Sequence, residues 1–358
     1  MAENFRLLAI NPGSTSTKMG VFDREKIIFQ HTLRHSVEEL SQYERVSHQY
    51  EFRKNAILKI LSENKIDIYS LRAVVGRGGL LKAIEGGTYQ VNKAMLNDLK
   101  KELQGEHASN LGGIIAHEIA QAIGVKAFIV DPVVVDELQD VARVSGLKEI
   151  KRKSIFHALN QKAVARRHAK NKGLRYEDMN LIVVHLGGGI SVGAHRKGRV
   201  VEVANALDGE GAFSPERTGG LPVGDLIRLC YSGKYTYEEM KKMIAGNGGM
   251  VSYLNTNNAI EVGKRIDNGD KYAEHIYYAM AYQVIKEIGS CAAVLRGNVD
   301  GILVTGGIAY DRRFTNWIEE SVNFISDIYI YPGEDELAAL AEGGLRVLED
   351  MEKAKEYR

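Results

Sequence analysis

The sequence predicts an α/β protein made of two similar domains. The chain has 358 residues, which is long for one hydrophobic core and suits two. Residues 181–195 repeat residues 7–21 without a gap, each time as an apolar strand, a glycine turn and a second strand. Elsewhere, short apolar runs that end in glycine alternate with helical patterns. A unit that occurs once in each half favours two domains of one kind.

The first repeated unit spans Leu7 to Phe22 and contains a turn suited to an anion. Gly13 lets the backbone approach a ligand closely, and the hydroxyls of Ser14 and Ser16 can donate to it, as can the amides of the turn. Lys18 adds a mobile positive charge. The stretch is not a Walker loop, because it lacks the G-x-x-x-x-G-K-[ST] pattern and an apolar strand follows it. We expect a phosphate-binding turn; the alternative is an ordinary hairpin with a polar tip.

The second unit, Leu181 to His195, places Gly187 where the first unit has Gly13. Two glycine turns at corresponding places in two halves would grip the phosphates of a nucleotide from opposite sides. The second turn has no lysine. In this predicted phosphate-binding site, Lys18 then supplies the charged group and the backbone supplies the rest.

Two charged side chains stand at the ends of predicted strands. Arg77 follows a strand over residues 72–75 and lies between glycines, which leave room for a ligand around a fork-shaped donor. Asp131 follows a strand over residues 126–130, at the carboxyl end where α/β sheets bind ligands. A plain surface arginine and a turn-capping aspartate are the alternatives.

Two histidines lie close to the starts of predicted helices. His107 precedes a helix over residues 111–123 and could cap it or pack against it. His157 lies near the start of a helix over residues 154–170, where the helix dipole favours a neutral imidazole or a bound anion. Residues 205–225 form a long loop rich in glycine and charge, and loops of this length are usually functional or disordered.

The last third of the chain carries another glycine-rich strand end and an acidic run. A strand over residues 299–304 opens into Gly306 and Gly307, where a nucleoside could lie against bare backbone; a tight turn is the alternative. Three acidic residues, 334–336, precede a closing helix over residues 337–353 and would complement its dipole. The polar stretch 146–153 is the expected linker between the two halves.

Composition limits the classes of partner. Lysine and arginine number 47 and aspartate and glutamate 46, so the formal net charge of +1 offers no overall field for nucleic acid or an anionic membrane. The two cysteines, Cys230 and Cys291, argue against a disulfide framework. The N-terminus lacks a leader pattern and the apolar segments are short or interrupted. We expect a soluble cytoplasmic protein.

Three motifs together carry a family resemblance. The strand ends NPGSTSTK, HLGGGIS and VTGGIA resemble the two phosphate motifs and the adenosine motif of the acetate and sugar kinase, Hsp70 and actin superfamily. Within it, the chain is similar to the acetokinase family, and there to the butyrate kinases, which carry Pro12 and Thr17 where acetate kinases typically show alanine and leucine. The resemblance covers essentially the whole chain.

The resemblance implies two actin-like (ASKHA, RNase H-like) domains with mixed sheets flanked by helices and a nucleotide cleft between them. The first would span residues 1–150, with residues 335–358 packing back on it, and the second residues 151–334.

The site residues of the family carry over by motif. The resemblance assigns the phosphates to Asn11, Ser14, Ser16 and Lys18 in the first motif and to His185, Gly187, Gly188 and Gly189 in the second, and the adenosine to Gly306 and Gly307. It assigns the substrate carboxylate to Arg77 and to the H-x-x-N residues His107 and Asn110. It assigns catalysis to Asn11, Arg77, Asp131 and His157, with His157 stabilising the transferring phosphoryl group, and the metal to Asp131 and Glu334.

The chain departs from the family pattern in two places. Acetate kinases have an arginine within a G-T-R-x-G-D stretch, and the corresponding residues 220–225 contain none. Arg217, a few residues earlier, is the candidate replacement. Near the C-terminus, Asp335 and Glu336 compete with Glu334 for the position of the metal-binding glutamate.

The resemblance implies reversible, in-line transfer of a phosphoryl group from ATP to butanoate, giving butanoyl phosphate and ADP, with Mg²⁺. A carboxylate is already ionised at neutral pH, so catalysis consists of positioning and charge neutralisation. A homo-oligomer, dimer or larger, is implied, with no nucleic-acid or membrane partner. The alternatives are a kinase of acetate, propionate or a branched-chain acid, an actin-like or Hsp70-like ATPase switch without a carboxylate substrate, and a nucleotide binder that is not an enzyme.

Overall fold

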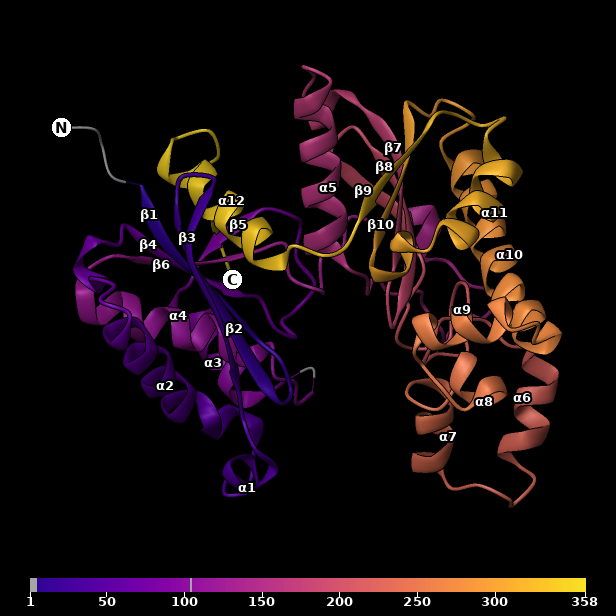
Figure 1. Ribbon diagram of the computed structural model, residues 1–358, viewed down its shortest axis with the longest axis horizontal. Coiled ribbons are helices and arrows are strands. Elements are labelled where there is room, and N and C mark those ends of the chain that lie inside the picture. Colours follow the sequence, from indigo (N-terminus) through magenta and orange to yellow (C-terminus); the bar gives the residue numbers. More distant parts are fainter. Residues whose placement is uncertain (1–4, 104) are drawn as a thin grey trace. The chain divides into compact units, whose positions relative to one another are not determined.

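A computed structural model describes residues 5–103 and 105–358 (Figure 1). The chain divides into two compact units, Met1–Val135 with Asp335–Arg358 (unit 1) and Asp136–Glu334 (unit 2). The elements of unit 1 are β1 (Arg6–Pro12), β2 (Ser16–Asp23), β3 (Lys26–Arg34), α1 (Val37–Leu40), η1 (Val46–Gln49), α2 (Tyr50–Glu63), η2 (Ile68–Ser70), β4 (Ala73–Arg77), β5 (Thr88–Gln90), α3 (Lys93–Lys101), α4 (Asn110–Ile123), β6 (Lys126–Val130), α12 (Glu336–Leu348) and β12 (Lys355–Glu356). Those of unit 2 are η3 (Asp140–Arg143), α5 (Ala158–Asn171), η4 (Tyr176–Asp178), β7 (Asn180–Leu186), β8 (Ile190–Arg196), β9 (Arg199–Val203), α6 (Val223–Cys230), α7 (Tyr237–Ile244), α8 (Met250–Leu254), α9 (Ala259–Asp267), α10 (Lys271–Val294), β10 (Gly301–Gly306), η5 (Gly307–Tyr310), α11 (Arg312–Val322) and β11 (Ile328–Pro332).

The boundary between the units falls before Asp136 and not after residue 150. The reason is that the chain is already held within unit 2 well before the polar stretch 146–153 begins. The carboxylate of Glu137 accepts hydrogen bonds from Lys162 Nζ at 3.1 Å and from the backbone N–H of Val200 at 2.7 Å. At the other end of the chain, β12 pairs with β5 and α12 packs on β1, β4 and β6, which places the C-terminal segment in unit 1.

The sheet of unit 1 has the strand order β12-β5-β6-β4-β1-β2-β3 over the described residues. Strands β1, β2 and β3 form an antiparallel meander, and β4 and β6 run parallel to β1. Successive residues of a strand point to opposite faces. On β4, the side chain of Val75 lies against Gly344 of α12, while the bare face of Gly76 lies against Gly112 of α4. A Cβ on Gly76 would be 2.0 Å from the Gly112 carbonyl oxygen, so glycine lets α4 approach the sheet. Helices α12 and α4 therefore cover opposite faces.

The sheet of unit 2 repeats this plan with the strand order β11-β10-β7-β8-β9 over the described residues. Strands β7, β8 and β9 form the antiparallel meander, and β10 and β11 are parallel to β7. Alternate residues of β7 again face two layers. Ile182 and Val184 belong to a core with α10, whereas Leu181 and Val183 belong to a core with α5. Each unit is thus a sheet with helices on both faces.

The repeat predicted from the sequence is present as the hairpins β1–β2 and β7–β8. The strands occupy corresponding stretches, but the pairing slips by one residue. Asn11 lies opposite Lys18 in the first hairpin, whereas the corresponding His185 lies opposite Ser191 in the second. The slip follows from the tighter turn between β7 and β8.

Other expected elements shift at their ends. Helix α5 begins at Ala158, four residues later than expected, with His157 at its N-cap. The loop expected over residues 205–225 ends earlier, because α6 begins at Val223. In the parts of the chain that the structure describes, none of the helices combines the length and apolar character that crossing a bilayer requires.

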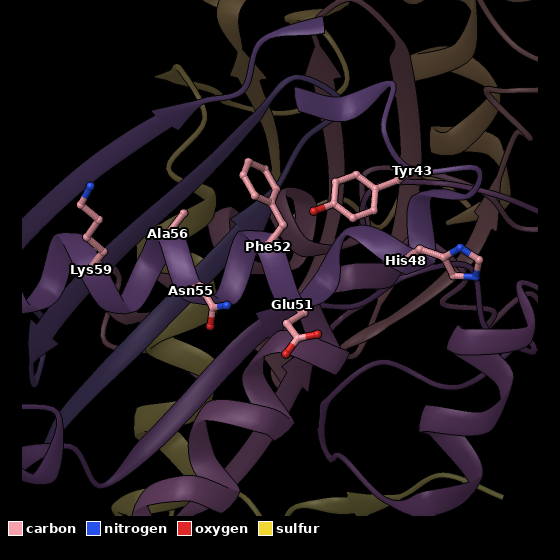
Figure 2. A pocket seen from close by; sticks show the side chains of 7 residues that line it. All are labelled: Tyr43, His48, Glu51, Phe52, Asn55, Ala56 and Lys59. Atoms are coloured by element: carbon pink, nitrogen blue, oxygen red, sulfur yellow. The ribbon is translucent and has the colours of Figure 1, made fainter. Parts of the chain in front are cut away.

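Helix α2 in unit 1 has one buried face and one face that borders a pocket. Arg53, Ile57 and Leu61, four residues apart, are buried. The opposite face lines a pocket of about 570 Å³ (Figure 2), formed by Tyr43, His48, Glu51, Phe52, Asn55, Ala56 and Lys59. None of these lining residues is a predicted site residue.

Candidate active site

Four predicted site residues of unit 1 lie on neighbouring strands at one end of the sheet. Lys18 is on β2 directly opposite Asn11 on β1, so both side chains project from the same face. Arg77 is the last residue of β4, the strand next to β1, and Asp131 immediately follows β6, the strand after that. The ends of adjacent parallel strands meet at one edge of a sheet, where ligands bind in α/β proteins.

Arg77 and Asn11 are joined by an acidic residue from the start of α12. The Arg77 Nη1 donates to Asn11 Oδ1 at 3.1 Å and lies 2.9 Å from Glu336 Oε1. The Asn11 Nδ2 donates to Glu336 Oε2 at 2.5 Å. Among the described residues, Nε and Nη2 of Arg77 have no hydrogen-bond partner. One side of the guanidinium is therefore fixed, and the other is available to pair with an anion.

Asp131 is held in an uncommon backbone conformation. Its φ is +37°, in the left-handed region that favours glycine, and its side chain is almost completely buried. The Gly87 N–H donates to Asp131 Oδ1 at 2.6 Å. Such strain persists where the surrounding structure fixes it, commonly at functional sites.

His107 lies near Arg77 and has a defined tautomer. The backbone N–H of Ser109 donates to His107 Nδ1 at 3.2 Å, so the ring proton is on Nε2. Burial, and secondarily the positive charge of Arg77, lowers the pKa of His107, which favours this neutral form. His107 is therefore a neutral N–H donor next to a cation.

Asn110 differs from His107 in that both polar atoms of its side-chain amide are hydrogen-bonded to backbone groups. Its Oδ1 accepts the Leu80 N–H at 2.8 Å and its Nδ2 donates to the Gly105 carbonyl at 3.1 Å. The side chain is fully buried. Asn110 shapes the loop that follows Arg77.

The first glycine turn presents its polar tip to solvent. The Gly13 N–H donates to the Ser16 carbonyl at 2.8 Å, which closes the turn, and Ser14 is exposed. Lys18 is exposed as well, and within the described residues its ammonium group has no hydrogen bond or ion pair. The turn thus offers hydroxyl, amide and ammonium donors together.

In unit 2, the predicted histidines form a stacked pair. The rings of His157 and His185 have centroids 3.8 Å apart and planes within 11° of parallel. His185 Nδ1 lies 2.9 Å from Asn160 Oδ1, and its Nε2 lies 3.2 Å from Glu334 Oε1. His157 Nδ1 lies 2.8 Å from the hydroxyl of Ser191. His185 is almost completely buried, whereas His157 retains partial exposure at the start of α5.

The two remaining glycine motifs come together at the same end of the unit 2 sheet. The Gly187 N–H donates to the Gly189 carbonyl at 3.0 Å in the turn between β7 and β8. Gly306 ends the adjacent strand β10 with φ of +96°, and a Cβ there would be 2.3 Å from the Leu186 carbonyl oxygen. Only glycine fits this approach, and Gly307 follows with open space on its bare face.

The long loop that follows β9 packs over the second glycine turn. Ser214 Oγ donates to the Gly188 carbonyl at 2.8 Å. The guanidinium of Arg217 lies directly against Gly189, where an added Cβ would be 2.2 Å from Nη1, and this Nη1 donates to the Ala206 carbonyl at 3.1 Å. Burial lowers the pKa of Arg217, although the neighbouring carboxylate of Glu216 opposes the effect. This loop therefore places the guanidinium of Arg217 against the second glycine turn.

The three acidic residues 334–336, which are alternatives for the metal-binding glutamate, lie in three different places. Glu334 lies beside His185 in unit 2, Asp335 caps α12 by accepting the Ala338 N–H at 3.0 Å, and Glu336 pairs with Arg77. Over residues 5–103 and 105–358, no three histidine, cysteine, aspartate or glutamate side chains gather as a metal-binding group.

The pairing of Glu336 with Arg77 is not predicted by the sequence, which indicates helix capping or metal binding for Glu336. Its position as the first residue of α12, three residues after a glycine, gave no signal that the helix starts beside β1 and β4. That contact depends on the return of the C-terminal segment to unit 1.

Comparison with known proteins identifies the family. A model of the acetokinase family matches residues 138–316. Butyrate kinase 1 of Clostridium acetobutylicum is 64% identical over 354 residues, which cover 99% of this chain and 100% of that protein. This chain belongs to the acetokinase family. Butyrate kinase 2 of the same organism, at 62% identity over 354 residues and 99% of each chain, is a further relative in the acetokinase family.

Solved structures of acetokinase relatives share the fold. Porphyromonas gingivalis acetate kinase aligns with a TM-score of 0.79 at 17% identity, over 96% of this chain and 100% of that one. Entamoeba histolytica acetate kinase aligns with a TM-score of 0.73 at 16% identity, over 94% and 98%. The expected α/β architecture of two actin-like units with mixed sheets flanked by helices is confirmed.

Proposed function

We propose that the protein transfers the γ-phosphoryl group of ATP to the carboxylate of butyrate, giving butyryl phosphate and ADP, and that it catalyses the reverse reaction. The observation that carries the proposal is the identity of 62% and 64% to two butyrate kinases over 99% of the chain. A carboxylate oxygen forms the new bond to phosphorus, and the bond to the bridging oxygen breaks as ADP leaves with its electron pair.

The acid binds through Arg77 and His107. Nε and Nη2 of Arg77, which have no partner among the described residues, pair with the carboxylate in the planar geometry that arginine favours. His107 adds a neutral donor through Nε2. Asn11 and Glu336 hold Arg77 in place, and Asn110 holds the loop beside it. Butyrate is distinguished from acetate by the two additional methylenes, worth about 0.8 kcal/mol each when buried.

The nucleotide binds through donors from both repeated hairpins. Lys18, Ser14 and Ser16 bind phosphate oxygens with the amides of the first turn, and the turn Gly187–Gly189 does so with His185 beside it. Gly306 and Gly307 leave room for the nucleoside. His157 donates to the equatorial oxygens of the phosphoryl group in transfer, and Arg217 takes the place of the family's second arginine, because its guanidinium lies at Gly189.

Magnesium is expected with the nucleotide, and the available donors fit it in kind. Mg²⁺ prefers oxygen ligands and is usually held by one or two carboxylates together with substrate phosphates. Asp131 and Glu334 are the carboxylates that would hold the ion, since Asp335 caps a helix and Glu336 pairs with Arg77. When bound, the ion neutralises charge on the phosphates.

A buried amide orients His157 for its role. Gln161 Nε2 lies 3.0 Å from the Ser191 carbonyl and 2.9 Å from its hydroxyl, so it donates to both. Its Oε1 therefore accepts from His195 Nε2 at 3.0 Å, and His195 Nδ1 accepts from the Tyr176 hydroxyl at 2.7 Å. The Ser191 hydroxyl proton is then directed to His157 Nδ1, which leaves the His157 proton on Nε2 as the donor.

Substituting leucine for Gln161 is expected to lower kcat by about 10- to 100-fold, the range for losing an outer partner of a functional histidine. KM for butyrate should change little, since Gln161 bonds Ser191 and His195 and, among the described residues, neither Arg77 nor His107. Steady-state kinetics well below the melting temperature of the variant provide the measurement. An unchanged kcat would show that Ser191 orients His157 without the amide.

The reaction is tested with ATP, Mg²⁺, hydroxylamine and a series of acids. We expect acyl hydroxamate with butyrate, at a kcat/KM above those for acetate, propionate and branched acids. A higher value for another acid would favour the corresponding acid kinase. ATP binding or hydrolysis without hydroxamate from any acid would contradict the carboxylate kinase and favour an ATPase switch or a nucleotide binder.

We also propose that the chain functions in the cytoplasm as a homo-oligomer, a dimer or larger. The support is the family resemblance. Sedimentation equilibrium of the purified protein measures the oligomeric state directly. A monomer at micromolar concentration would contradict the proposed homo-oligomer.

A further inference from the structure

A fully buried arginine lies beneath the first phosphate turn. Arg53 projects from α2, and its Nη1 donates to the carbonyls of Gly13 at 2.7 Å and Ser16 at 3.0 Å. Its Nη2 donates to the carbonyl of Ser14 at 2.9 Å. Nη1 also lies 3.2 Å from Thr17 Oγ1. One side chain from a helix thus binds four polar groups within residues 13–17.

The positive charge of Arg53 has no acidic partner among the described residues. Its remaining donors, Nε and Nη2, both bind Gln49 Oε1, at 3.1 and 2.7 Å. Buried charges are normally paired, because removing a cation from water costs several kcal/mol. Burial lowers the pKa of Arg53 to about 10, so the group remains a cation at neutral pH. The turn therefore has a fixed, uncompensated positive charge on its inner side.

The contacts of Arg53 also decide which way the turn amides point. In a trans peptide, the carbonyl of one residue and the N–H of the next point in opposite directions, and the chain has no cis bonds among its described residues. The carbonyls of Gly13 and Ser14 point inward at the guanidinium. The N–H groups of Ser14 and Thr15 consequently point outward, on the exposed side of the turn.

We propose that Arg53 is a positioning residue for phosphoryl transfer, which orients the first turn so that its outward amides bind the phosphate chain of the nucleotide. The charge of Arg53, behind those amides, adds to the attraction for the polyphosphate. This inference rests on the proposed function, because it takes the turn to be a phosphate-binding one.

A buried histidine extends the support for the turn. Thr17 Oγ1 accepts from Arg53 and lies 2.9 Å from His35 Nε2, so its hydroxyl proton is directed to His35. Burial, with the charge of Arg53 as the next cause, lowers the pKa of His35, in keeping with a neutral ring that accepts. His35 in turn packs edge-on against Phe52, a wall of the pocket in Figure 2, with ring centroids 5.3 Å apart. The turn is thus linked to α2 at two points.

Arg53→Met, Arg53→Lys and the control Ile57→Ala test the proposal. Ile57 is buried on the same face of α2 one turn later, so its truncation weakens the helix packing and leaves the guanidinium in place. We expect Arg53→Met to lower kcat/KM for ATP by about 100-fold or more, with KM for butyrate within twofold. Arg53→Lys, which keeps the charge and loses the fork, should recover part of this loss. Ile57→Ala should lower the melting temperature and leave kcat/KM for ATP within about twofold.

The proposal is overturned if Arg53→Met retains kcat/KM for ATP within threefold of the unmodified protein, or if Ile57→Ala loses as much at a temperature where both are folded. Should Arg53→Met fail to fold, Arg53→Lys decides: a raised KM for ATP at unchanged KM for butyrate supports the role, and an unchanged KM for ATP refutes it. If the unmodified protein phosphorylates no acid, the proposed function fails separately. Equilibrium dialysis with Mg·ATP then tests Arg53, since weaker binding by Arg53→Lys than by Ile57→Ala supports positioning and equal binding refutes it.

Discussion

Replacing His157 with alanine is expected to lower kcat by about 10²- to 10³-fold, the usual cost of removing one donor to a charge that develops in the transition state. The protein should remain folded, because His157 is partly exposed, and its hydrogen bond to Ser191 and its stacking on His185 lie at the start of the helix and not in a hydrophobic core. A hydrogen bond of this kind contributes about 1 kcal/mol. Hydroxamate formation with saturating butyrate and ATP measures the effect.

The matched control is His117→Ala on α4. His117 has a similar partial exposure, and within the described residues its ring makes no hydrogen bond. This substitution should leave kcat within about twofold. His157→Gln, which keeps an N–H donor, should fall between the alanine variant and the unmodified protein. Near-normal turnover of a folded His157→Ala protein would remove His157 from the reaction.

The fold was largely predictable because it is repeated. One strand-turn-strand pattern in each half indicated two like units, and the structure has the corresponding hairpins β1–β2 and β7–β8 with parallel strands beyond them. The unit boundary was not predictable from composition. A polar stretch looks like a linker wherever it lies, but the ion pairs of Arg152 with Glu202 and Glu210 show that this stretch lies within unit 2.

The site was predictable where a residue stands in a glycine-rich motif, and less so where a side chain arrives from elsewhere. Arg77, Asn11 and Lys18 come together because their strands are neighbours. Glu336 reaches Arg77 from the far end of the chain, a contact between residues more than 250 positions apart. No local pattern specifies such a contact.

Arg53 shows a signal that was present but not used. The helical spacing of the apolar residues between positions 36 and 65 predicts a scaffold helix and no site. An arginine on the same stripe as Ile57 and Leu61 occupies a core position, where a lone cation is costly. A basic residue within an apolar stripe therefore indicates that some group must satisfy it. Here that group is the turn of residues 13–17.

Lys18→Ala is expected to lower kcat/KM for ATP by about 100-fold while the melting temperature stays nearly unchanged. The cause is that Lys18 is exposed and has no partner among the described residues, so it contributes little to the folded state. Its ammonium group is the charged donor of the first turn, and the corresponding turn of unit 2 has none. Removing a charge-assisted hydrogen bond that binds phosphate in the transition state lowers kcat/KM by about this factor.

The control for Lys18 is Lys26→Ala, which removes another exposed positive charge, on β3 of the same sheet. It reports how far a change in net charge alone affects ATP binding, and it should leave kcat/KM within about twofold. Lys18→Arg should retain more activity than Lys18→Ala, because the charge is kept while the geometry changes. Two results would make Lys18 a surface residue of plain scaffold: equal losses in Lys18→Ala and Lys26→Ala, or a fall in melting temperature that accounts for the lost activity. Suppose instead that Lys18→Ala stays folded with a lowered kcat/KM for ATP, and that the buried substitution Arg53→Met lowers kcat/KM for ATP equally. The first turn then depends on two cations: Arg53 orients its backbone, and Lys18 supplies the charge that binds phosphate.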